Sequence, residues 1–227
     1  MTGSDAASQL LRQLKLSSPL VGRFVALEPL GSQHAAGLVT AAAEGRDTFA
    51  HTWVPDGIDD AERYIATALA QQATGKVVPF VQRRLADGVI CGSTRFMNIE
   101  TWSWDEGDGM PDAAEIGSTW LSASAQRTTI NTEAKLLLLR HVFEVWHVQR
   151  LWIKTDALNT RSRTAIERLG ARFEGILRNH LPAVGRPGPR DTASYSIIPP
   201  EWPEVRAGLE RRLVMSSGLP QADEPIG

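Results

Sequence analysis

The amino-acid sequence predicts an α+β fold in which one mixed, mostly antiparallel sheet is flanked by helices. Short alternating or apolar runs typical of strands recur along the chain, and three of them follow one another directly between Val77 and Leu121. Two helical segments then separate the later strands. Because strands on either side of a crossover helix run parallel, the sheet should combine parallel and antiparallel pairs.

The first part of the chain predicts one strand and two helices. Arg23–Glu28 alternates in hydropathy and suits a strand. Ser32 is a candidate N-cap for a helix that ends near Ala43. Asp59 and Glu62 have the spacing of a capping box, and the apolar stripe after them predicts a second helix.

The remaining elements follow in the order three strands, helix, strand, helix and two strands. The first helix among them carries an unbroken apolar run, Leu136–Leu139, so it should be buried against the sheet. Asn159 precedes the second helix and Gly170 follows it. The predicted ranges are Val77–Gln82, Gly88–Met97, Ala114–Leu121, Thr132–Trp146, Arg150–Asp156, Thr160–Leu169, Arg172–Leu177 and Tyr195–Ile198.

Length and composition favour one domain. The chain has 227 residues, which suffices for one well-buried core. We expect a polar tail over residues 1–20, a single domain over 21–214, and a second flexible tail over 215–227, where Gly, Pro and Ser are frequent.

Charge and cysteine content exclude several classes of protein. The net charge of −2 gives no global attraction for nucleic acid or an anionic membrane, so neither is an expected partner. No apolar run approaches the roughly 20 residues that span a bilayer. The single cysteine, Cys91, excludes an internal disulfide, and its apolar neighbours predict a buried, inert thiol. We expect a cytoplasmic protein.

Common catalytic motifs are missing. The sequence has no G-x-S-x-G elbow and no H-E-x-x-H helix. Its five histidines lie without ligand spacing, so no metal is expected, and His141 and His147 are predicted at a helix surface. Serine hydrolysis and metal catalysis are therefore disfavoured.

The informative segment runs from Glu115 to Lys135. A strand ends near Leu121, a short polar turn follows, and a long helix begins near Thr132. A helix N-terminus has backbone N–H groups without internal partners and a positive dipole end, which together can seat a pyrophosphate. Arg127 and Lys135 would add positive charge, but these residues alone favour the alternative, a turn in which Asn131 only caps the helix.

This segment resembles the acyl-CoA loop of GNAT acyltransferases, whose pattern is Q/R-x-x-G-x-G/A. Further segments are similar to the RimJ/RimL branch of that superfamily, which contains ribosomal-protein N-terminal acetyltransferases. The resembling residues are Gln126-Arg-Thr-Thr-Ile-Asn131, Asn159-Thr-Arg-Ser162, Ile166-Glu-Arg-Leu-Gly170, Glu174-Gly-Ile-Leu-Arg178, Arg190-Asp-Thr-Ala-Ser-Tyr-Ser196 and Glu201-Trp-Pro203. The resemblance implies a GNAT-like fold and transfer of an acyl group from acetyl-CoA, or another acyl-CoA such as succinyl-CoA, to an amine.

The resemblance also implies a cofactor site. Thr129 and Asn131 stand where the general pattern has glycines, whose missing side chains let the backbone approach the phosphates. A CoA-binding domain without turnover is the alternative of another class. The implied cofactor residues are Leu121, Gln126, Arg127, Thr128, Thr129, Ile130, Asn131, Thr132, Asn159 and Arg163.

Two residues are candidates for catalysis. Glu115, at the start of the strand that enters the loop, is the candidate base, acting through water; a purely structural carboxylate is equally compatible. By resemblance, Ser162 would protonate the departing CoA thiolate, and a structural first-turn serine is as compatible.

The resemblance implies that the acceptor is an amine of a protein N-terminus, a lysine or a small molecule. Tryptophans beside acids suit a cationic or amphipathic acceptor, although they also suit a core or a dimer contact. The candidate acceptor residues are Trp53, Asp56, Trp102 and Trp104. A homodimer is compatible with the resemblance.

Overall fold

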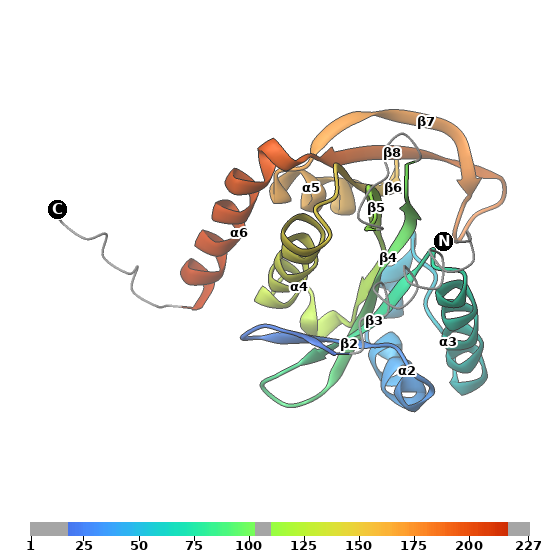
Figure 1. Ribbon diagram of the computed structural model, residues 1–227. Helices are drawn as coiled ribbons and strands as arrows, with labels where there is room; N and C mark the ends of the chain where they lie inside the picture. Colours follow the sequence, from blue (N-terminus) through green and yellow to red (C-terminus); the bar gives the residue numbers. More distant parts are fainter. Residues whose placement is uncertain (1–17, 103–109, 218–227) are drawn as a thin grey trace, which may run out of the picture.

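The computed structural model describes residues 18–102 and 110–217, which form one eight-stranded sheet with helices on both sides (Figure 1). The strand order is β1-β2-β3-β4-β5-β6-β8-β7. Neighbouring strands are antiparallel except β5 and β6, which are parallel, so the predicted α+β class is confirmed. The strands are β1 (Leu20–Val21), β2 (Val25–Pro29), β3 (Val78–Arg84), β4 (Ile90–Glu100), β5 (Ala113–Leu121), β6 (Arg150–Asp156), β7 (Arg172–Pro182) and β8 (Pro189–Ile197).

The helices cover both faces of the sheet (Figure 1). Helices α2 and α3 pack on the face that presents Val81 and Trp120. Helices α4, α5 and α6 lie on the other face, where their apolar residues share one core with Phe80 and Phe96. The helices are α2 (Ala35–Ala43), α3 (Ile58–Ala73), α4 (Thr129–Arg140), α5 (Thr160–Leu169) and α6 (Trp202–Ser217).

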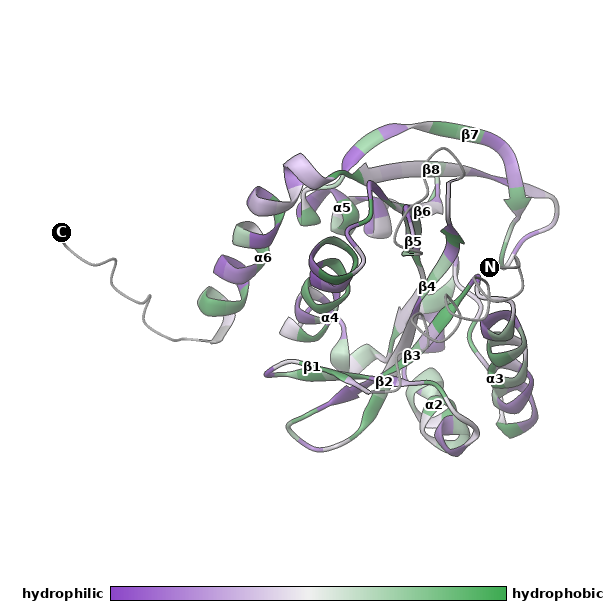
Figure 2. Cartoon of the chain, viewed as in Figure 1, coloured by the Kyte–Doolittle hydropathy of each residue, from purple (hydrophilic) through white to green (hydrophobic). Residues whose placement is uncertain are grey.

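Helix α4 is the central helix of the larger core. Leu136, Leu138 and Leu139 are buried, which confirms the predicted burial of this run. Figure 2 shows the hydrophobic residues of α4 and of the central strands. A π-helical turn, His141–Val145, continues the helix. His141 is buried against Phe96 and Trp146, so its predicted position on the helix surface was wrong.

The predicted order of elements agrees with the structure, and the ranges of β6 and α5 agree residue for residue. Asn159 and Gly170 explain this for α5: the Asn159 side chain accepts from Ser162 N, and Gly170 adopts a left-handed φ of +97°. The strands flanking α5 run in the same direction, but β8 lies between them.

Other boundaries differ. α4 begins at Thr129, three residues before the predicted start, because the Thr128 side chain caps it by accepting from Ile130 N. α3 begins after Gly57 without a side-chain cap, so the capping box predicted at Asp59 is not formed. β1 and α6 were not predicted. α6 contains Pro203 in its first turn, where a missing N–H costs nothing.

Candidate active site

β5 and β6 pair over only three positions and then separate. The pairs are Ala113 with Arg150, Ala114 with Leu151 and Glu115 with Trp152. Beyond them β5 follows β4, and β6 follows β8. We call the two facing edges, Ile116–Leu121 and Ile153–Asp156, the unpaired segment. Their outward backbone groups have no strand partner, so a ligand can bind them.

A β-bulge shapes the unpaired segment. Ser93 lies opposite Trp120 and Arg95 opposite Gly117, so β5 carries one extra residue between these pairs. Ser118, within the bulge, has a left-handed φ of +47°. Bulges are frequent beside functional sites because they redirect side chains and backbone groups.

The end of β5 directs a backbone donor into the unpaired segment. Ser122 N donates to Cys91 O of β4 at 2.8 Å. Because N–H groups alternate between the two edges of a strand, the N–H of Leu121 faces the other edge, where β6 no longer pairs. A free backbone N–H at this place can stabilise an oxyanion.

The loop from Leu121 to Thr132 is held by Gln126 and Thr128. Gln126 Nε2 donates to Leu121 O at 2.9 Å and to Thr48 Oγ1 at 3.1 Å. Thr128 Oγ1 donates to Ala125 O at 2.7 Å. These contacts bring the loop back onto the end of β5, and α4 then begins with its free N–H groups at the open end of the unpaired segment.

The glycine positions of the acyl-CoA pattern do not require glycine geometry here. Thr129 and Asn131 lie in the first turn of α4, whereas Arg127 is the loop residue with positive φ, +61°. The backbone can therefore adopt this turn without glycine. Asn131 Oδ1 is buried and lacks a hydrogen-bond partner among the described residues. A rotation of the Asn131 amide would put its NH₂ group at the position that Oδ1 now occupies.

Arg161 was not predicted from the sequence. Its Nη2 donates to Gln126 Oε1, so a cation from the first turn of α5 contacts the loop that precedes α4. The sequence signal for Arg161 is its place in the Asn159-Thr-Arg-Ser162 segment. A residue two places after the N-cap lies at the N-terminal end of the helix, where backbone N–H groups are free.

Ser162 and Arg163, two predicted site residues of α5, have different surroundings in the structure. The Ser162 hydroxyl has no hydrogen-bond partner in the described part of the chain, and the side chain is half-buried. Arg163 Nε donates to Tyr195 Oη at 3.1 Å, and its guanidinium lies over the Phe173 ring. Arg163 is thus held against β7 and β8.

Glu115 lies at the point where β5 and β6 separate. It is 6% exposed, and its Oε2 accepts from Asn98 Nδ2 at 2.9 Å and from Lys154 Nζ at 2.8 Å. The contact with Lys154 is an ion pair, so the buried Glu115 side chain has a charge partner. No described residue donates to Oε1, so this oxygen can bind a water or an amine.

The predicted acceptor residues are only partly brought together. Trp53 is 49% exposed and stacks on Tyr64 of α3, with ring centroids 5.7 Å apart. Asp56 lies nearby, with Oδ1 3.6 Å from Arg46 Nη1. Trp102 Nε1 donates to Glu100 Oε2 at the far end of β4. Trp104 lies outside the described residues.

A buried carboxylate joins three segments at the end of β6. Asp156 is 1% exposed; its Oδ1 accepts from Leu158 N at 2.9 Å, and its Oδ2 lies 2.8 Å from Arg186 Nη2. His51 Nδ1 is 3.7 Å from the same oxygen. Arg186 comes from the β7–β8 loop and His51 from the α2–α3 connection. Asp156 therefore fastens these two loops to the end of the unpaired segment.

Replacing Arg186 by alanine should destabilise the protein by about 1–2 kcal/mol, because a buried carboxylate loses its closest cation. Burial raises the pKa of Asp156, but the hydrogen bond from Leu158 and the Arg186 charge outweigh it, so the net pKa lies below 3.8. A depressed pKa stabilises the fold above the unfolded value and loses this contribution as the pH falls through the folded value. The difference between variant and wild type should therefore shrink below about pH 4.

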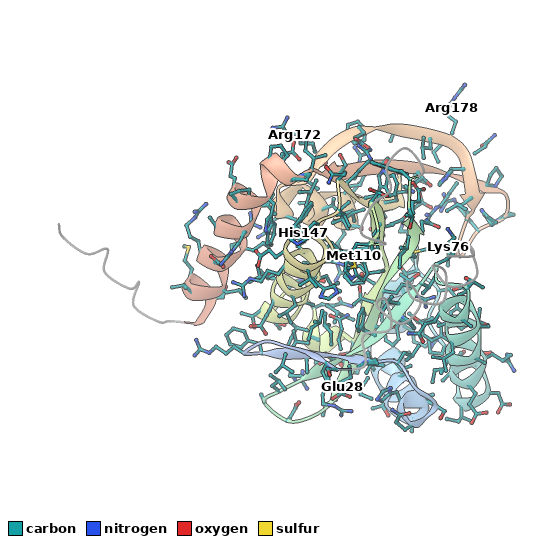
Figure 3. The ribbon with its side chains drawn as sticks, in the orientation of Figure 1. Glu28, Lys76, Met110, His147, Arg172 and Arg178 are labelled. Carbon is teal, nitrogen blue, oxygen red and sulfur yellow. The ribbon has the colours of Figure 1, made fainter. Side chains whose placement is uncertain are left out.

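Urea unfolding at pH 7 and at lower pH measures this difference. Arg178→Ala is the matched control, because Arg178 projects outward from β7 and makes no ion pair within the described residues (Figure 3). Equal stabilities of the two variants at pH 7 would contradict a role for Arg186 in fastening the loops.

Other reactive groups are inert or scattered. Cys91 is buried, and burial raises the pKa of its thiol to about 11, which confirms the predicted buried thiol. In the described residues no group of three or more His, Cys, Asp or Glu side chains could hold a metal ion. Within the same ranges no helix is both long and apolar enough to cross a bilayer.

Comparisons with known proteins show which family model and which solved structures this chain is similar to. Residues 25–172 match the model of the "Acetyltransferase (GNAT) domain". A GCN5-related N-acetyltransferase from Brucella melitensis is 31% identical, with a TM-score of 0.73 over 86% of this chain and 84% of that one. RimJ of Mycobacterium smegmatis, solved with CoA-disulfide, shares the fold at 22% identity, with a TM-score of 0.68 over 86% of this chain and 89% of that one.

A curated bacterial relative is similar over part of its length. The chain is 30% identical over 118 residues to the Bacillus subtilis protein named "Putative ribosomal N-acetyltransferase YdaF". The match spans 52% of this chain and 58% of that protein, so this chain covers less than two thirds of the relative's length.

Proposed function

Because the chain belongs to the GNAT acetyltransferase family, we propose that it transfers an acyl group from acetyl-CoA to a primary amine. The observation that carries this proposal is the unpaired segment between β5 and β6, which ends at the N-termini of α4 and α5. An extended thioester can bind the free edge of β5, and its phosphates can lie at the start of α4. Family members bind acyl-CoA, and no metal is part of the proposal.

The loop would bind the pyrophosphate. The N–H groups of the first turn of α4 and the cation of Arg161 lie at the same end of the unpaired segment. Their contact through Gln126 holds the two helix ends together. Charge-assisted hydrogen bonds to phosphate from such groups are stronger than neutral ones.

The reaction would proceed by direct attack in a ternary complex. The amine nitrogen bonds to the thioester carbon, the carbon–sulfur bond breaks, and the amine loses a proton while the sulfur leaves as thiolate. Glu115 would accept that proton through water, and Ser162 would donate one to the thiolate. The N–H of Leu121 would stabilise the oxyanion.

The acceptor side would be the face that carries Glu115. Trp53 and Asp56 belong to the α2–α3 connection on that side of the sheet, beside an aromatic ring of α3. An α-amine with a pKa near 7.8 is about 10–15% free base at pH 7, whereas a lysine is almost wholly protonated. A protein N-terminus is therefore the acceptor to test first, followed by lysine and small amines.

Calorimetric titration with acetyl-CoA, with CoA as comparison, tests the cofactor site. Arg161→Ala should raise the Kd for acetyl-CoA about tenfold, because one charge-assisted hydrogen bond to phosphate is lost. Arg168→Ala is the matched control, since Arg168 is an exposed arginine of the same helix, and its Kd should stay within about twofold.

Two outcomes would count against the proposal. No binding of acetyl-CoA or CoA at millimolar concentration would refute the site. Binding without release of CoA in the presence of any amine acceptor would indicate a CoA-binding domain without turnover.

A further inference from the structure

Lys135 is a buried cation without an acidic partner. It lies on α4, is 5% exposed, and its Nζ donates to Thr119 Oγ1 at 2.7 Å. In the described parts of the chain no carboxylate lies within 4.0 Å of this nitrogen. A single hydroxyl satisfies only one of the three donors of an ammonium.

Such a group is costly to keep in the core. Buried charges in proteins are normally paired, and a buried group left unpaired calls for an explanation. Burial lowers the pKa of Lys135 to about 7, so the ammonium is only partly populated near neutral pH. Methionine or leucine would fill the same space without this penalty.

Three titratable groups on this side of the sheet, Glu133, Cys91 and His141, do not serve as the missing partner. Glu133, two residues earlier on α4, binds the N–H groups of Arg23, Phe24 and Val25. Cys91 of β4 and His141 after α4 are buried there too, and burial favours the neutral form of both by raising the pKa of Cys91 and lowering that of His141.

The hydroxyl that Lys135 contacts belongs to the bulge of β5. Thr119 lies in the unpaired segment, one residue after Ser118, and its Oγ1 is also 2.8 Å from Thr94 Oγ1. Lys135 is six residues beyond Thr129, about 9 Å along α4 from the helix N-terminus. The cation is thus well beyond the phosphate end of the proposed ligand and against the strand that would bind its thioester end.

We propose that Lys135 binds a carboxylate at the end of the acyl chain, so that the protein accepts a short dicarboxylic acyl-CoA, such as succinyl-CoA, in addition to acetyl-CoA. This inference rests on the proposed function. The transfer is the same: the amine nitrogen bonds to the thioester carbon, the carbon–sulfur bond breaks, and the product amide keeps the free carboxylate. A carboxylate beside Nζ supplies the charge partner that the fold lacks.

Succinyl-CoA and butyryl-CoA are the matched probes, because both acyl chains have four carbons and only the terminal carboxylate differs. Calorimetry on the full chain should give a Kd for succinyl-CoA at least about tenfold lower than for butyryl-CoA. At pH 8, titrations in buffers of different ionisation enthalpy should show proton uptake with succinyl-CoA and none with butyryl-CoA, because the carboxylate favours the ammonium form of Lys135.

Lys135→Met should abolish both the preference and the proton uptake. Lys76→Met is the control, since Lys76 is an exposed lysine whose Nζ donates to Ile99 O, and it should keep both. Equal affinities for the two thioesters, or no proton uptake by the wild type, would overturn the inference while leaving acetyl-CoA binding intact. Failure of every CoA thioester to bind would instead overturn the proposed function.

Discussion

Replacing Glu133 by alanine is expected to lower the free energy of unfolding by about 3–5 kcal/mol, the largest effect on stability that we predict. Glu133 is 6% exposed, and its carboxylate accepts three backbone N–H groups: Arg23 at 2.8 Å, Phe24 at 2.6 Å and Val25 at 2.8 Å. Removal of the carboxylate leaves these donors without acceptors where α4 contacts the start of β2.

Chemical denaturation of Glu133→Ala and Glu133→Gln measures this contact. The loss of stability for Glu133→Gln should be smaller than that for Glu133→Ala, because the glutamine oxygen can still accept a hydrogen bond. Some loss should remain, because the NH₂ group faces a backbone donor. Glu204→Ala is the matched control: Glu204 is an exposed glutamate of α6 without an ion pair in the described residues, and its loss should change stability by less than about 0.5 kcal/mol. A loss below 1 kcal/mol for Glu133→Ala would show that water replaces the carboxylate.

Gly22 gives an independent check on the same contact. A Cβ added to Gly22 would lie 2.3 Å from the Glu133 carboxyl carbon, so Gly22→Ala should also destabilise the protein. The contact of Glu133 with residues 22–25 thus depends both on the carboxylate charge and on the close approach of the Gly22 backbone.

The sequence predicted those parts of the fold whose signals are local. α5 has its N-cap and its C-terminal glycine within the helix's own neighbourhood, and β6 is a continuous alternating run, so both ranges agree with the structure. α4 shows the limit. Two residues, Thr128 and Asn131, can each cap a helix, and only the turn held by Gln126 and Ala125 selects Thr128.

The candidate site was only partly predictable, because its main feature is a relation between two strands. Nothing in β5 or in β6 alone indicates that they pair over three positions and then separate. The partners of Glu115 and Glu133 lie far away in the sequence: 39 residues separate Glu115 from Lys154, and 110 residues separate Glu133 from Arg23. The sequence predicted that Lys135 adds positive charge to the anion site from the helix, and only tertiary packing shows that this side chain is buried.

Replacing Glu115 by glutamine is expected to reduce kcat at pH 7 by about 10²-fold, at the lower end of the range for loss of a general base. The Kd for acetyl-CoA should change little, because Glu115 lies at the start of the unpaired segment and the phosphate loop at its other end. Glutamine keeps the size of the side chain and can still accept from Asn98 and Lys154, so the local packing should persist. Steady-state rates with an N-terminal peptide as acceptor measure the effect.

The pH dependence separates a base from a structural carboxylate. An α-amine acceptor becomes largely free base as the pH rises from 7 to 9, so the need for a base declines and the gap between wild type and Glu115→Gln should narrow by about tenfold. If Glu115 only held Lys154, the loss would not depend on the protonation of the acceptor, and Lys154→Met would reproduce it at every pH. A constant ratio of the two rates from pH 7 to pH 9 would therefore assign Glu115 to the structure, and a ratio that falls as the amine deprotonates would assign it to proton transfer.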